Sequence, residues 1–156
     1  MPTAPRPLAL TTPEGMYASL AVAVVCLAWS GHDVGDLALE IVVYSVALWL
    51  FHVYARVVHG GWEARSRGKL RYWAVHEWPH LEAAVPALVA VGLGWLAALD
   101  PVAVSDLAMW VTIANLLAWQ VVILRPAGRG AGAIAATVGI NAVVLAALIA
   151  LRLQVK

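Results

Sequence analysis

Four residues able to carry charge or hydrogen bonds recur at multiples of four positions within one apolar stretch. They are Glu40, Tyr44, His52 and Arg56, and we call them the polar ladder. On a helix each four-residue step overshoots a full turn by about 40°, so the ladder winds slowly around one side. Ionisable groups inside membrane helices are costly and often mark proton or ion paths, and histidine exchanges protons near neutral pH. The ladder therefore indicates transfer of protons or a monovalent cation.

A second set of residues has the types of metal ligands. Glu77 and His80 match Glu-x-x-His, and His76 precedes His80 by four residues. Di-metal helical bundles use two such motifs and two further inward glutamates. Here one motif is present, and Pro79 interrupts it. A metal site at His76, Glu77 and His80 is one hypothesis, and bonds from these histidines to lipid phosphate, water or backbone are the other. The sequence requires no cofactor.

The sequence lacks the residue patterns that several other functions require. Ser19, Ser30, Ser45 and Ser105 have no Gly-x-Ser-x-Gly setting. The single cysteine, Cys26, excludes an internal disulfide. A net charge of +1, with no basic domain, argues against nucleic acid as a partner.

The composition indicates that the surrounding solvent is lipid. The 156 residues are 63% hydrophobic and only 12% charged, with a mean hydropathy of +0.83. A soluble domain carries about twice that charged fraction, and so small a globule cannot bury this much apolar surface. A crossing helix needs about 20 mostly apolar residues.

We expect an all-α fold, a polytopic transmembrane bundle of about five helices in a single domain. The first expected span loosely resembles a signal peptide, but it is preceded by only one basic residue, Arg6, and has Glu14 in its first turn. We therefore keep it as a span. A flexible tail is expected over 1–12, and the spans over 13–30, 36–59, 79–99, 101–124 and 130–153.

A count of 1.5 Å per residue predicts which groups meet the ladder. With His59 and Pro79 at one membrane boundary, Arg56 and Glu82 both lie about 4–5 Å deep and are expected to form an ion pair. Glu40 is left near the other end without a basic residue at its level.

Three amides are expected to add to the polar path. Gln120 falls near the level of His52. Asn115 and Asn141 both fall near the midplane, where they could hydrogen-bond between the fourth and fifth spans.

The basic residues orient the bundle. The connection after the second span holds a basic patch, Arg65, Arg67, Lys69 and Arg71, whereas the connections at the other end have no Lys or Arg and carry aspartates instead. The positive-inside rule then predicts a bacterial plasma membrane protein with a cytoplasmic N-terminus and an external C-terminus. The patch is expected to bind anionic lipid of the inner leaflet.

Helical spacing continues through this connection. Leu70, Trp73, Ala74 and Trp78 form a stripe between Ser66 and Trp78, which predicts a short amphipathic helix on the inner membrane surface. An ordinary basic loop is the alternative.

Small residues four apart predict close helix contacts, within one protomer or between protomers. They are Ala90, Gly94 and Ala98, and Ala131, Ala135 and Gly139. Five helices make a thin bundle, so a homo-oligomer is expected.

Three stretches together resemble a group of small, uncharacterised polytopic membrane proteins common in high-GC Gram-positive bacteria. The stretches are Trp49–Ala55, His76–Ala84 and Ala114–Trp119. The resemblance implies a bacterial plasma membrane protein and no particular activity. It also implies that the position of Arg56 is often acidic in that group, which would make an Arg56 ion pair particular to this chain.

The leading functional hypothesis is a small-ion channel or secondary transporter, for protons or a monovalent cation, acting as an oligomer with its path along the second span. A non-catalytic membrane scaffold or accessory subunit is the first alternative. A membrane-embedded metal-binding protein or enzyme is the second.

Overall fold

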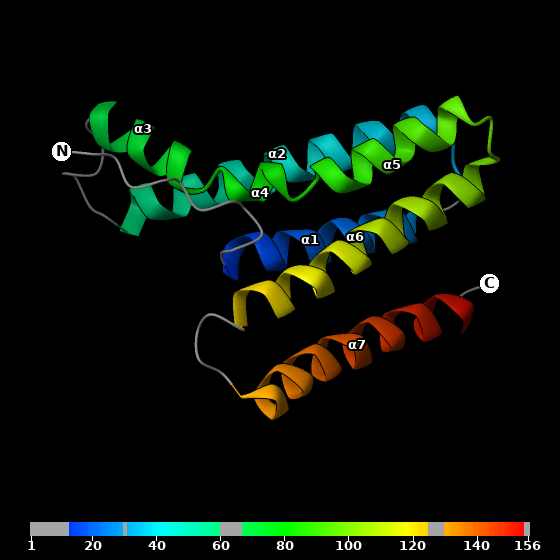
Figure 1. Ribbon diagram of the computed structural model, residues 1–156. Helices are drawn as coiled ribbons and strands as arrows, with labels where there is room; N and C mark the ends of the chain where they lie inside the picture. The colour runs from blue at the N-terminus through cyan, green and yellow to red at the C-terminus, as the bar shows by residue number, and fades with distance from the viewer. Residues whose placement is uncertain (1–12, 30, 60–66, 125–129, 155–156) are drawn as a thin grey trace.

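The chain folds into a bundle of helices, seen in a computed structural model that describes residues 13–29, 31–59, 67–124 and 130–154 (Figure 1). Within these ranges every regular element is a helix and none is a strand, which confirms the all-α fold class. The predicted tail 1–12 lies outside the described residues. The helices are α1 (Pro13–Ala28), α2 (Val34–His59), α3 (Arg67–His76), α4 (Pro79–Glu82), α5 (Val85–Leu96), α6 (Pro101–Leu124) and α7 (Ala131–Gln154).

Two helices are long and apolar enough to cross a membrane. They are α2 and the first 18 residues of α6, Pro101–Ala118. A third crossing is possible if the bent pair of segments Lys69–Glu82 and Val85–Leu96 counts as one span, and Gly15–Ala28 and Ala131–Val144 are shorter apolar helices. The fold thus fits a membrane protein, while the count of five crossings stays a prediction.

Side-chain caps explain where two of these helices begin. The Asp33 carboxylate accepts a hydrogen bond from the Gly35 N–H at 2.7 Å, so α2 starts at Val34, two residues before the expected Asp36. The Asp100 carboxylate accepts bonds from the N–H groups of Val102 and Ala103, each at 3.0 Å, and caps α6 in the same way.

The expected third span is broken. Ala83 and Ala84 separate α4 from α5, and the segments on either side differ in direction by 41°. Pro86 explains the break, because it lacks the N–H that would bond the carbonyl of Glu82. Ahead of α4, a helix forms over Arg67–His76, and its position on a membrane surface stays a prediction.

The core lies around α1, which packs chiefly against α6. Cys26 is fully buried, and its carbonyl accepts a 2.6 Å hydrogen bond from the Ser105 hydroxyl of α6. Leu37 and Ile41 of α2 and Val104 of α6 complete the same apolar cluster.

The two small-residue stripes have different surroundings. Ala90 and Gly94 of α5 are buried, and Gly94 lies close to Val104 of α6, as a helix-packing stripe should. Ala98 follows the end of α5 with a positive φ of 54° and does not extend that stripe. The stripe on α7 is exposed, at the edge of the bundle (Figure 1).

Candidate functional site

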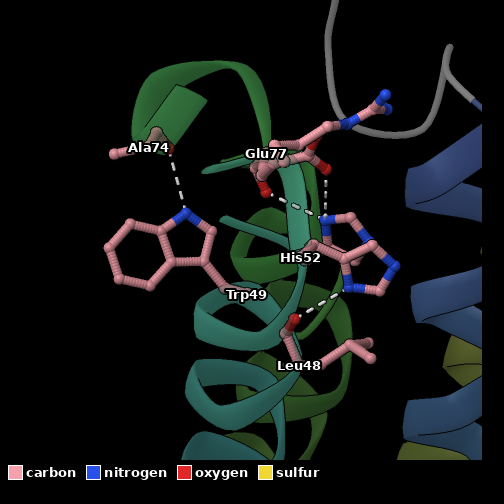
Figure 2. A network of polar contacts seen from close by, with 7 residues as sticks. Leu48, Trp49, His52, Ala74 and Glu77 are labelled. Atoms are coloured by element: carbon pink, nitrogen blue, oxygen red, sulfur yellow. Dashed lines mark hydrogen bonds and ion pairs between the residues drawn. The ribbon is translucent and has the colours of Figure 1, made fainter. Parts of the chain in front are cut away.

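The second half of α2 is joined to α3 and α4 by aromatic side chains. The Trp49 indole N–H donates a 2.9 Å hydrogen bond to the carbonyl of Ala74 (Figure 2). The Trp49 and Trp78 rings meet edge to face at 6.5 Å, and the Arg56 guanidinium carbon lies 5.5 Å from the centre of the Trp73 ring. These contacts fix α3 and α4 beside the end of α2 where the charged groups lie.

Glu77, in the turn between α3 and α4, is a fully buried carboxylate. Its Oε1 accepts a 2.9 Å hydrogen bond from Arg56 Nε in an ion pair, and the Arg56 side chain is 46% exposed. Its Oε2 has no hydrogen-bond partner in the described part of the chain. Glu77 is therefore shielded from solvent while one of its oxygens still has room for a proton or a donor.

Two histidine rings stack next to this carboxylate. The ring centres of His52 and His80 are 4.1 Å apart, with 31° between the ring planes. His80 Nδ1 lies 2.9 Å from the backbone oxygen of Glu77 and 3.6 Å from its Oε2, and His52 Nδ1 lies 2.8 Å from the oxygen of Leu48 (Figure 2). A carbonyl oxygen only accepts, so Nδ1 carries the proton in both rings.

With Nδ1 protonated, Nε2 is the basic nitrogen of each neutral ring. The Glu77 carboxylate lies beside the stacked rings, with Oε2 3.6 Å from His80 Nδ1. We call His52, Arg56, Glu77 and His80 the carboxylate–histidine cluster. It joins two imidazole rings, a buried carboxylate and a guanidinium through a ring stack and an ion pair.

The predicted Arg56–Glu82 ion pair is wrong, because Arg56 is paired with Glu77. The depth count assumed that a helix starts at Pro79, level with His59. Instead the chain turns directly from α3 into α4, and the pairing is displaced by five positions, from Glu82 to Glu77. Glu82 is half-buried near the bend.

The polar ladder is divided between two places. His52 and Arg56 belong to the cluster, whereas Glu40 and Tyr44 line a groove of about 410 Å³ between α2 and α1. From His52 to Glu40 the distance along the helix axis is about 18 Å.

The three amides lie apart from the cluster. Gln120 is fully buried and shares a groove of about 310 Å³ between α1, α6 and α7 with Asn141, rather than meeting His52. The Asn141 amide donates to the carbonyl of Thr137 in its own helix at 3.2 Å. Asn115 Nδ2 has no partner among the described residues, so the expected Asn115–Asn141 bond is absent there.

The expected metal ligands are not assembled. In the part of the chain that the structure describes, no three His, Cys, Asp or Glu residues are placed to hold a metal ion. His80 lies beside Glu77, but His76 is exposed and stacks on Tyr72, with ring centres 5.7 Å apart.

The basic patch lies partly within α3. Lys69 and Arg71 are exposed on that helix, Arg67 is its first residue, and Arg65 lies outside the described residues. Contact of these side chains with anionic lipid stays a prediction.

Sequence reasoning missed the His52–His80 stack and the bond from Trp49 to Ala74. The signal was present in the tryptophans at 49, 73 and 78, since large rings on two antiparallel helices tend to meet. Comparison with protein-family models, curated proteins and solved structures finds no match for this chain.

Proposed function

We propose that this chain is a bacterial plasma membrane protein whose carboxylate–histidine cluster binds and releases protons, as part of a channel or proton-coupled secondary transporter. The observation that supports it best is Glu77, which is fully buried and has one oxygen without a hydrogen bond from the described residues. Leaving a buried polar group unsatisfied costs about 1–3 kcal/mol. Such groups concentrate where a protein uses them.

The cluster supplies each part of a proton-binding step. A proton arriving at Nε2 of His52 converts the ring to an imidazolium, which attracts the Glu77 carboxylate across the stacked His80 ring. Arg56 holds Glu77 Oε1 and balances its charge while no proton is bound. Departure of the proton from Nε2 restores the starting state.

The proposal includes a membrane topology. Five helices cross the plasma membrane, with the N-terminus cytoplasmic, the C-terminus external and α3 on the inner surface, where its basic residues meet anionic lipid. The cluster then lies at the inner end of α2, and Glu40 and Tyr44 continue the path toward the outer side. A homo-oligomer would supply the walls that one thin bundle lacks.

Proton flux into proteoliposomes tests the proposal. Full-length protein is reconstituted with a pH-sensitive dye inside the vesicles, and a potential drives proton entry. We expect Glu77→Gln and His52→Gln each to lower the flux at least about tenfold, since the first removes the carboxylate that stabilises the imidazolium and the second removes the imidazole that binds the proton.

His76→Gln is the matched control, because His76 is an exposed histidine on the neighbouring helix outside the cluster. Its flux should equal that of the unaltered protein. Flux that persists in both cluster variants, or no flux in the unaltered protein, would contradict the proposal.

A scaffold or accessory subunit is the second candidate, supported by how the helices satisfy their own polar groups. Ser45, His52 and Thr112 each hydrogen-bond a carbonyl four residues earlier in the same helix. A polar group satisfied in this way needs no path or ligand. Co-purification with a stoichiometric partner protein, together with absent flux, would favour this function.

A further inference from the structure

The groove between α1 and α2 combines a carboxylate with aromatic walls, away from the carboxylate–histidine cluster. Glu40 and Tyr44 line it from α2, and Tyr17, Ala21, Ala28 and Trp29 line it from the α1 side. Its volume of about 410 Å³ lies within the range of small-molecule sites, about 300–1,000 Å³. The remaining lining is aliphatic.

Glu40 has no counter-charge among the described residues of this groove. It is partly buried, and in the described ranges it makes no hydrogen bond or ion pair. None of the described residues that line the groove is Lys, Arg or His. A carboxylate among apolar side chains is costly without a cation beside it.

The nearby end of the bundle is also negative. Asp33 and Asp36 are exposed at the start of α2, within about two turns of Glu40. Such a field attracts positive ligands and repels negative ones.

The walls select the kind of cation. A bare inorganic ion needs several oxygen ligands to replace its water, and Glu40 is the one acidic residue among the described residues that line this groove. An organic cation with an apolar body needs one carboxylate for its charge, aromatic faces nearby and an apolar surface for the rest. Tyr17, Trp29 and Tyr44 supply those faces.

We propose that this groove binds a lipophilic organic monocation, of the quaternary ammonium or phosphonium class, with its charge at Glu40. The ligand enters sideways along α1, where Tyr17 is 74% exposed. This site shares Glu40 and Tyr44 with the outer part of the proposed path, but binding of the cation in the groove does not require proton flux through the cluster.

Equilibrium dialysis of full-length protein in a nonionic detergent, with radiolabelled tetraphenylphosphonium as the probe, tests the proposal. The unaltered protein should bind the probe saturably. Glu40→Gln keeps the side-chain shape but removes its charge, and should weaken binding at least about tenfold. Ala21→Phe fills the groove, leaves Glu40 in place, and should weaken binding to a similar extent.

Asp36→Asn is the matched control, because it removes an exposed carboxylate one turn earlier on the same helix. Its affinity should change by less than about twofold. Triphenylphosphine oxide, a neutral analogue, should not displace the probe. Circular dichroism and gel filtration establish that each variant is folded, and Ala21→Phe carries the test if Glu40→Gln does not fold.

Three results would overturn the proposal. They are the absence of saturable binding, an unchanged affinity in both Glu40→Gln and Ala21→Phe, and displacement of the probe by the neutral analogue at equal concentration. Proton flux through the cluster is measured separately, so either proposal can fail alone.

Discussion

The partners of the Arg56–Glu77 ion pair differ greatly in exposure. Glu77 is fully buried, whereas nearly half of the Arg56 side chain is exposed. Removing the arginine leaves a charge in the interior, while removing the carboxylate leaves a charge that water reaches. The two partners are therefore not equivalent in their effect on stability.

We predict that Arg56→Gln lowers the free energy of unfolding by about 1–3 kcal/mol, because Glu77 loses its counter-charge. Glu77→Gln should cost less than about 1 kcal/mol. The double variant should resemble Glu77→Gln alone, and thermal unfolding in detergent measures all three. Arg71→Gln, an exposed arginine on α3, serves as the control, and strictly additive effects at 56 and 77 would contradict the coupling.

At the scale of residues, the sequence predicted where the cluster lies better than it predicted which carboxylate pairs with Arg56. Arg56 was predicted to meet a carboxylate near the start of the third span, and it meets Glu77 just ahead of that start. The contact between His52 and His80 was not predicted. Which carboxylate faces Arg56 depends on the register of two helices. That register is set by the Trp49–Ala74 bond and the ring contacts, which a count of residues from an assumed helix start does not contain.

Among the elements, α5 and α6 approach each other at a glycine. A Cβ atom added to Gly94 would lie 2.9 Å from Val104 Cγ2, closer than real contacts of this kind. Gly92, two residues earlier on α5, has nothing within 4 Å of the same position. Substituting each of these two glycines in turn therefore compares a tight contact with open space on the same helix.

Gly94→Ala should lower the free energy of unfolding by about 1–3 kcal/mol, since α5 and α6 must separate or Val104 must shift. Gly92→Ala should be neutral or stabilise by up to about 1 kcal/mol, as expected for a helical glycine in open space. Adding Val104→Ala to Gly94→Ala should restore part of the loss. Equal effects of the two glycine substitutions in thermal unfolding would show that the contact does not limit packing.

Pro86 accounts for the bend ahead of α5. Pro86→Ala supplies the missing N–H, and we predict that the two segments straighten from their 41° bend. Spin labels at the exposed positions of Tyr72 and Leu96, in a Cys26→Ala background, should then move apart by about 2–3 Å. An unchanged distance in pulsed electron spin resonance would mean that packing, rather than the proline, holds the bend.

The sequence predicted the elements well where a local cause is sufficient. The fourth span was expected over 101–124, which is the range of α6, where Asp100 caps the helix. The second span was expected to begin at 36, two residues late, because the cap at Asp33 was not predicted. The division of the polar ladder was not predicted, because helical spacing places Glu40 and His52 on related faces without saying which neighbour covers each part.

At the scale of the molecule, the proposed topology places the α1–α2 turn and α3 on opposite sides of the membrane. The test uses a membrane-impermeant maleimide added to intact cells, in a Cys26→Ala background. Both His32 and Lys69 are exposed on the protein, so only the side of the membrane decides their labelling. The reagent should label His32→Cys, on the outer side, but not Lys69→Cys, on the inner side. Inverted vesicles should give the reverse pattern, as the positive-inside rule requires. Labelling of both positions from one side would contradict the orientation.

The hydrogen bond from Ser105 to the Cys26 carbonyl has a consequence for how the chain is made. Its partners are 79 residues apart in sequence. At a synthesis rate of about 5–20 residues per second, Cys26 is added to the chain roughly 4–16 s before Ser105. For that interval the helix at the centre of the core is without its chief packing partner, and a chain that stalls before α6 presents that surface to chaperones and proteases.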